Sequence, residues 1–267
     1  MTDISNADYH ADPAVSASHL KTVMQSPYHY WSRYLDPDRV AMVPTAAMRL
    51  GSLTHCAVLE PDELTKRYQL APDRRTKEGK AAVVEMAAAG IEAVSEADLA
   101  QALQMADAVR SNSTASLLLA SGQAEQSFWW DDVATGMRCK CRPDWLSADG
   151  ETIVDLKTCS DASPASFAKA VAQWSYQVQA AHYLCGTLAK RFVFAAVEKS
   201  APYAVGVYEL DAEAMVHGSV LRHTSLQKIQ DCRAINSWPG YTDDGIQTLQ
   251  LPGWALKDNS TITSEDF

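Results

Sequence analysis

Charged residues interrupt two apolar stretches near the middle of the chain, RPDW at 142–145 and IVDLKT at 153–158. Side chains two positions apart in a strand point to the same face, so Asp155 and Lys157 share one side of the second stretch. Asp144 lies eleven residues before Asp155, with a short turn between them. Pairing of adjacent strands would therefore bring the two carboxylates together.

Two carboxylates at close range repel each other unless they share a proton or hold a cation. A divalent metal is the simplest resolution, and Mg²⁺ is commonly bound by one or two carboxylates together with water and phosphate oxygens. Lys157 would then lower the pKa of a metal-bound water or stabilise charge that develops on a phosphorus centre. The pattern predicts phosphoryl chemistry, and an edge-strand salt bridge between Asp155 and Lys157 is the alternative.

Basic residues occupy alternate positions on the strand that leads to Asp144, which places them on one face of that strand. They are Arg138, Lys140 and Arg142. A solvated outer face is the ordinary explanation for such a row in an antiparallel sheet.

Five motifs occur together between Ser16 and Trp238. They are RPDW, IVDLKT, SASHLKTVMQSPYHY, RLGSLTHCAVLEP and the spacing Y-x-x-Q-x-x-x-Y at Tyr176, Gln179 and Tyr183. Each is short, but in combination the chain resembles the RecE, or exonuclease VIII, group of phage-type recombination exonucleases. That group belongs to the PD-(D/E)XK nuclease superfamily and is related to the nuclease domain of RecB. The resemblance implies a restriction-endonuclease-like core, an α+β fold with a central mixed sheet flanked by helices.

The resemblance also implies a metal site. His55 would be a metal ligand, although a lone histidine on an apolar helix is more often structural. Asp144, Asp155 and the carbonyl of Leu156 would complete the ligands for two Mg²⁺ ions, for which Mn²⁺ can substitute. Lys157 would assist the nucleophile, and Gln179 would orient Lys157 or a scissile phosphate. Glu60 and Glu125 are weaker candidates: either one would be a ligand of the second metal, or they are a helix-end and a strand-edge charge, respectively.

Further residues are candidates for DNA contact. Ser16, Ser18 and Lys21 mark a helix start, where backbone amides and the helix dipole favour an anion. Plain N-capping explains the serines equally well, and a surface salt bridge explains Arg49. The full set of candidates is Ser16, Ser18, Lys21, Arg49, Arg138, Lys140, Arg142 and Tyr183.

The activity that the resemblance implies is Mg²⁺-dependent exonucleolytic digestion of linear double-stranded DNA. It would proceed 5′ to 3′ and leave 3′ single-stranded overhangs for recombination. The implied partners are DNA ends, a single-strand annealing protein of RecT type and further copies of the chain in a homotrimeric ring. A structure- or site-specific endonuclease on the same core is one alternative. The other is a catalytically silent module that binds DNA ends and recruits an annealing protein.

The composition constrains the class of protein. The 267 residues suit one domain, 1–267, with a core at about 16–238 and an irregular tail at 239–267. A net charge of −10 argues against a protein that coats nucleic acid, unless local basic grooves face the DNA. Neither a secretory signal nor a membrane-spanning stretch is visible, so we expect a cytoplasmic protein without a membrane partner.

Periodicity and turn signals predict the elements that must position these residues. Helices are expected around 16–35 with a break at Ser26–Pro27, and from Gly51–Ser52 to near Pro61. Two or three more are expected within 77–120, with breaks at Gly90 and around 111–113. Three antiparallel strands are expected within 126–158, with turns at 134–136 and 148–150. One helix at 164–188, strands at 191–198 and 203–210 and a helix at 211–234 complete the prediction.

Overall fold

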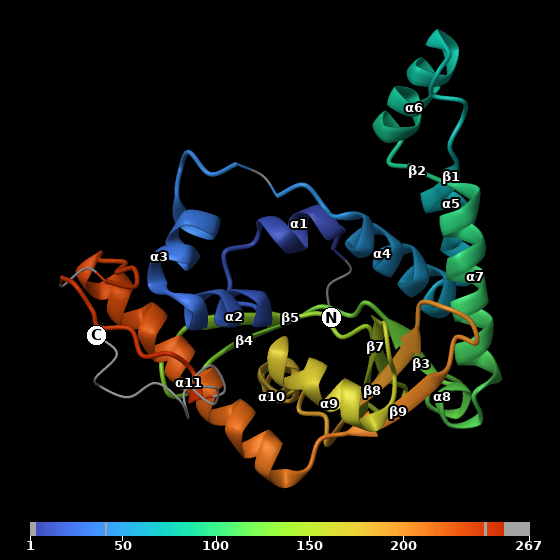
Figure 1. The fold of residues 1–267 in the computed structure, drawn as a ribbon. Helices are drawn as coiled ribbons and strands as arrows, with labels where there is room; N and C mark the ends of the chain where they lie inside the picture. Colours follow the sequence, from blue (N-terminus) through green and yellow to red (C-terminus); the bar gives the residue numbers. More distant parts are fainter. Residues whose placement is uncertain (1–3, 41, 243–244, 254–267) are drawn as a thin grey trace, which may run out of the picture.

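A five-stranded sheet forms the centre of the molecule (Figure 1). The structure is a computed structural model that describes residues 4–40, 42–242 and 245–253. Strands β7 and β8 are parallel and the other neighbouring pairs are antiparallel, which confirms the predicted mixed sheet. In spatial order the strands are β3 (Gly122–Ala124), β6 (Trp145–Ser147), β7 (Thr152–Cys159), β8 (Arg191–Glu198) and β9 (Val205–Glu209).

Helices cover both faces of β7 and β8, which explains why these strands are apolar on both sides. Val154 and Leu156 pack on one face with residues such as Met105. Ile153 and Phe194 pack on the other face, the one to which Asp155 also points. The first face is covered by α4 (Ala46–Leu59), α7 (Glu96–Ser111) and α8 (Ser113–Leu118), and the second by α9 (Pro164–Gln173) and α10 (Tyr176–Thr187).

The three strands expected within 126–158 are four. The expected middle strand is interrupted at Pro143, because proline cannot donate to a strand ladder. Its first half pairs in a separate two-stranded sheet, and its second half, β6, joins the main sheet. The separate sheet consists of β4 (Phe128–Asp131) and β5 (Arg138–Cys141) and packs with α2 (Ala17–Gln25), α10 and α11 (Ala212–Ile235).

Several predicted helix boundaries need correction. The helix expected at 164–188 is two helices, because Ser175 adopts a left-handed backbone conformation with φ of 51°. Helix α4 begins at Ala46, where the Thr45 side chain accepts a hydrogen bond from the Met48 amide. The break at Ser26–Pro27 is confirmed. Before and after α2 lie α1 (Asn6–Ala11), α3 (Pro27–Tyr30) and a π-helix (Trp31–Leu35).

A narrow arm projects from the α4–α7 side of the molecule (Figure 1). The predicted breaks at Gly90 and 111–113 are confirmed, because they separate α6, α7 and α8. The short strands β1 and β2 at the base of the arm pair in parallel and were not predicted. The arm and its base contain a 3₁₀-helix (Pro61–Glu63), α5 (Leu64–Arg67), β1 (Tyr68–Leu70), α6 (Lys77–Ala88) and β2 (Glu92–Val94).

The chain beyond α11 is irregular at 238–242 and 245–252. Residues 243–244 and 254–267 of the predicted tail lie outside the described residues. Within the residues that the structure describes, no helix is both long and apolar enough to cross a membrane.

Candidate active site

Asp144 lies between β5 and β6, directly before the main sheet resumes. Trp145 pairs with Val154 on β7, so Asp144 lies beside the centre of that strand. Its Oδ2 accepts a hydrogen bond of 2.8 Å from the Leu156 amide. The predicted proximity of Asp144 to the Asp155–Lys157 segment is therefore present.

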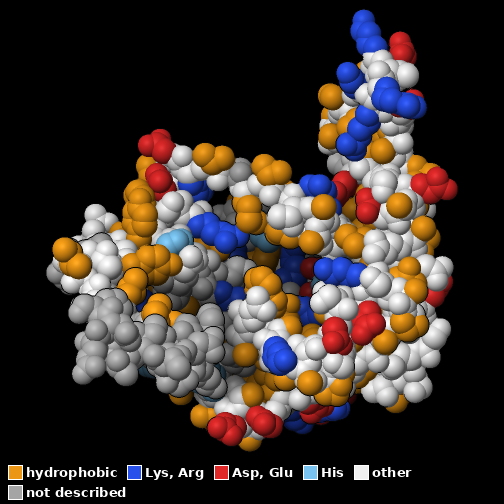
Figure 2. Space-filling view, in the orientation of Figure 1, with side chains coloured by type: hydrophobic (Ala, Val, Ile, Leu, Met, Phe, Trp, Pro, Cys, Tyr) orange, Lys and Arg blue, Asp and Glu red, His pale blue; other side chains and the backbone are white. Residues whose placement is uncertain are grey.

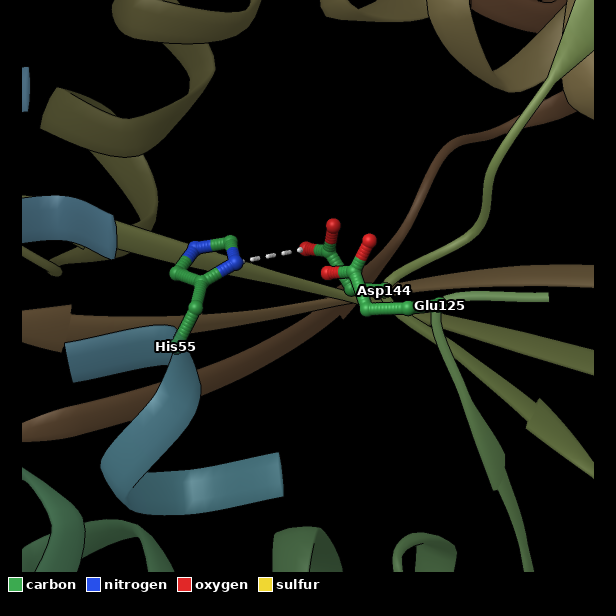
Figure 3. Close-up of side chains that lie close together, drawn as sticks. All are labelled: His55, Glu125 and Asp144. Carbon is green, nitrogen blue, oxygen red and sulfur yellow. Dashed lines mark ion pairs between the residues drawn. The ribbon is translucent and has the colours of Figure 1, made fainter. Parts of the chain in front are cut away.

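His55 and Glu125 approach Asp144 from two other elements. His55 projects from α4, and its Nδ1 lies 3.5 Å from Asp144 Oδ2. Glu125 follows β3, and its amide donates a 3.2 Å hydrogen bond to the Asp144 carbonyl. One ligand atom from each of the three residues lies within 4.8 Å of the others. Figure 3 shows both carboxyl groups on the side of Asp144 and Glu125 that faces the imidazole.

The electrostatics of this cluster favour a cation. Burial, and then the negative charge of Asp144, raises the pKa of Glu125 to about 8. Glu125 also has a φ of 53°, a conformation that is uncommon for residues other than glycine and is enriched at functional sites. An imidazole and two carboxylates that repel each other match the donor set of a divalent metal, so the residues present fit such an ion.

Asp155 forms a second polar group beside this cluster. Its side chain is fully buried, forms an ion pair with Lys157 and accepts a 2.6 Å hydrogen bond from the Gln179 amide. Burial is the main reason that the pKa of Asp155 rises to about 6, and the charge of Asp144 adds to it. Burial alone would lower the pKa of Lys157, but the carboxylates of Asp155 and Asp144 raise it. Lys157 is therefore held as an ammonium ion.

Comparison with known proteins now places the chain. Residues 16–248 match the family described as "PDDEXK-like domain of unknown function (DUF3799)". The chain belongs to this PDDEXK-like family. A search among curated proteins finds no match.

One solved structure is similar to the chain in fold over nearly its whole length. The chain is similar to a protein from Eubacterium rectale designated "Putative exonuclease", at 16% identity and a TM-score of 0.65. That alignment covers 98% of this chain and 100% of the other. A phage-related exonuclease from Haemophilus somnus 129PT matches at 13% identity and a TM-score of 0.36, over 60% of this chain and 84% of the other.

Within the PDDEXK-like fold, the predicted site residues fall into two groups. Asp144 and His55 lie in the cluster that could hold a metal, whereas Asp155 is paired with Lys157 and Gln179. Leu156 lies next to the cluster through its amide, which bonds Asp144. Gln179 contacts Asp155 rather than Lys157. The spacing of Tyr176, Gln179 and Tyr183 was the signal that placed this helix face at the site.

The structure separates the two glutamates left open by the sequence. Glu125 belongs to the cluster with His55 and Asp144. Glu60 instead accepts two hydrogen bonds of 2.8 Å from the Arg67 guanidinium, so its carboxylate already has a partner. Glu125 was a weak candidate in the sequence because β3, the three-residue strand that positions it, carries little periodic signal.

Lys21, predicted to contact DNA, lies near the Asp155–Lys157 pair. Its Nζ lies 3.5 Å from Gln179 Oε1 and 5.0 Å from the centre of the Tyr176 ring. Lys157 Nζ also lies 5.0 Å from that ring. Burial, followed by the charge of Lys157, lowers the pKa of Lys21 to about 8.

A cavity of about 940 Å³ opens beside Glu125, and several residues that were predicted to contact DNA line it. The Ser16 amide donates to His19 Nδ1 at 2.9 Å, so this residue takes part in helix capping. Tyr183 lies on the cavity wall. The predicted residues that line the cavity are Ser16, Ser18, Lys140, Arg142 and Tyr183.

The expected row of three free cations needs correction at Lys140. This side chain is only 2% exposed, and its ammonium donates to the backbone carbonyls of Tyr9 and Asp12. Arg142 donates a 2.7 Å bond to Ser127, and the exposed Arg138 pairs with Asp131 at 3.4 Å. Lys140 therefore has a structural role, because its side chain is covered by the N-terminal segment that it binds. Arg49 is exposed and donates to the Pro44 carbonyl at 2.6 Å.

Proposed function

We propose that this protein is a metal-dependent deoxyribonuclease that digests linear double-stranded DNA from its ends. The single observation that carries the proposal is the cluster of His55, Glu125 and Asp144, whose ligand atoms lie within 4.8 Å beside the Asp155–Lys157 pair. Membership of the PDDEXK-like family supports phosphodiester hydrolysis. The exonuclease designations of the similar proteins point the same way, although they are statements about those proteins.

The residues of the chain would divide the work as follows. His55, Glu125 and Asp144 would hold a divalent cation, Mg²⁺ or Mn²⁺, which would supply charge stabilisation at the phosphate. Lys157, kept protonated by Asp155, would donate to a phosphate oxygen as negative charge develops there. Gln179 would fix the orientation of Asp155 and so of the ammonium beside it.

We also propose that Asp155 and the Leu156 carbonyl bind a second Mg²⁺. This binding requires one rearrangement of the side chains. Gln179 occupies one oxygen of Asp155, and the Lys157 ammonium faces the other. An ion at this place would therefore have to displace that ammonium. The 5′ to 3′ direction, the homotrimeric ring and a RecT-type annealing partner follow from the resemblance to recombination exonucleases.

The test compares linear duplex labelled separately at its 5′ and 3′ ends with a covalently closed circle of the same sequence. We expect Mg²⁺-dependent release of the 5′ label first, intact circles, and loss of digestion in an Asp144→Asn variant. Cutting of the circle would favour a structure- or site-specific endonuclease. End binding without digestion in any divalent metal would favour the silent recruiter.

A further inference from the structure

The arm, residues 71–91, carries slightly more positive than negative charge in an otherwise acidic chain. It holds four basic residues and three acidic ones, Asp73, Glu78 and Glu85. With Lys66 and Arg67 at its base, six basic residues lie between positions 66 and 80. Three of the six have carboxylate partners, as Lys66 pairs with Glu63, Arg67 with Glu60 and Arg75 with Asp73. Among the residues that the structure describes, the other three, Arg74, Lys77 and Lys80, form no ion pair.

These three cations are presented to solvent on a projecting element. On the face seen in Figure 2, Lys and Arg side chains gather on the arm and around the hollow below it. Gly79 is the only buried residue of α6, so the helix adds almost nothing to the core. The function of the arm must therefore lie outside packing.

Local hydrogen bonds connect the residues at the tip of the arm. The Asp73 carbonyl accepts hydrogen bonds from the Thr76 amide and hydroxyl at 3.2 and 3.0 Å. A Cβ added to Gly79 would lie 2.0 Å from that carbonyl oxygen, so only glycine allows the loop to fold back this closely. A fixed loop presents its charges with little loss of conformational freedom when a partner binds.

Stability of α6 does not explain where the cations lie. Thr76 already caps the helix by accepting a hydrogen bond from the Gly79 amide at 2.9 Å. Lys77 is the first residue of α6 and Lys80 lies one turn later. Cations stabilise the last turn of a helix and are unfavourable in the first. A bound anionic partner would offset the unfavourable interaction between these cations and the helix dipole.

The chemistry of the arm identifies the kind of anion. Residues 71–91 contain no aromatic residue, Asn, Gln or His, so they offer no ring for base stacking and no side-chain amide for reading adenine. Lysine ammonium groups suit phosphates as point charges. A surface of this type fits the backbone of duplex DNA without regard to sequence.

A groove connects the arm to the helix that carries His55. It has a volume of about 460 Å³ and is lined by both Arg49 of α4 and Arg74 of the arm. Arg49 precedes His55 by six residues, about 9 Å along the helix axis. The same groove is also lined by Asp73, Glu92 and Asp98. Because Arg49 and Arg74 line one groove, a backbone bound at one of them can reach the other.

We propose that the arm, residues 71–91, is a second DNA contact. It would bind the phosphate backbone of the duplex at a distance from the scissile bond. This inference rests on the proposed function. The chain as a whole carries a net charge of −10, so cations without carboxylate partners would be local points at which DNA is attracted.

The test replaces Lys77→Gln and Lys80→Gln together. The matched control is Lys169→Gln with Lys228→Gln, two exposed lysines on α9 and α11 that have no ion pair among the described residues. Affinity for duplexes of two unrelated sequences, each several helical turns long, is measured in EDTA at several salt concentrations. Digestion in Mg²⁺ is measured on the same duplexes and on one only a few base pairs long.

We expect the arm variant to bind both long duplexes roughly tenfold or more weakly, with a salt slope lower by about one per lysine. Digestion of the short duplex should equal that of the wild type, which also shows that the variant folds. Equal weakening in the control, or wild-type affinity in the arm variant, would overturn the inference, and the latter would favour an acidic protein as partner. Digestion by the wild type in the same assay keeps the proposed function standing in either case, whereas absence of any DNA binding and digestion would overturn both.

Discussion

The side-chain amide of Gln179 donates a 2.6 Å hydrogen bond to Oδ1 of Asp155, the carboxylate that also pairs with Lys157. Because Asp155 is fully buried, this bond and the ion pair replace the water that the carboxylate loses on folding. Helix α10 thus controls the orientation of a pair that lies on the sheet. A residue of the helix, Gln179, thus helps to orient two side chains of the strand, Asp155 and Lys157.

Replacement of Gln179 by leucine should destabilise the protein by about 1–3 kcal/mol, because a buried acceptor loses its donor. Digestion of DNA should also weaken, since the Lys157 ammonium is no longer fixed. The control is Gln177→Leu on the same helix. Gln177 is also buried, but its side-chain oxygen has no partner among the described residues. Equal urea midpoints for the two variants would contradict this role of Gln179.

Replacement of Lys157 by methionine should remove digestion and cost about 3–5 kcal/mol of stability, because it leaves Asp155 as an unpaired buried charge. The double variant Asp155→Asn/Lys157→Met should be more stable than Lys157→Met alone, since no charge is left uncompensated. Urea unfolding of the two single variants and the double variant measures this coupling. Additive losses would show that the pair does not interact as described.

Glu125→Gln should weaken Mg²⁺ binding at least tenfold. Loss of a residue that only hydrogen-bonds a metal ligand typically has an effect of this size, and Glu125 would be a ligand itself. The metal-free variant should keep its stability, because the replaced carboxyl repels Asp144. Glu60→Gln is the control, since this residue pairs with Arg67 instead. Calorimetric titration with Mg²⁺ checks both. A larger effect of Glu60→Gln on Mg²⁺ binding would show that Glu60, and not Glu125, is the metal ligand.

His182 should make the folded state sensitive to acid. The side chain is buried, its Nε2 lies 3.1 Å from the Lys140 carbonyl, and burial lowers its pKa to about 3. Below its ordinary pKa of about 6.5, the unfolded chain binds a proton that the folded chain does not, so stability falls as the pH drops. The contribution is about 1.4 kcal/mol per pH unit between these values. His182→Gln should flatten the loss of unfolding free energy between pH 7 and pH 5, and an unchanged slope would contradict this.

The sequence predicted the fold well wherever local rules decide the structure. Alternation and turn signals located β7, β8 and the hairpin turns, and Pro27 marked the end of α2. It failed at Ser175 and at Thr45, where one backbone angle or one cap sets a boundary that propensity does not show. The short strands β1, β2 and β3 were missed because three residues carry too little periodicity.

The proximity of the candidate site residues was predicted where strand geometry alone fixes it. Side chains two apart on β7 and the pairing of β6 with β7 brought Asp155, Lys157 and Asp144 together. The burial of Lys140 could not be predicted, because it depends on carbonyls of Tyr9 and Asp12, more than a hundred positions away. The place of Glu125 depends in the same way on β3 and on a positive φ.

The most direct measurement is anomalous diffraction from crystals of this protein soaked in Mn²⁺. We expect a manganese peak among His55 Nδ1, the Glu125 carboxylate and Asp144 Oδ2, and loss of that peak in the Asp144→Asn variant. A soaked crystal without a peak between these three side chains, or with its only manganese elsewhere, would contradict the metal-dependent site on which the proposed nuclease activity depends.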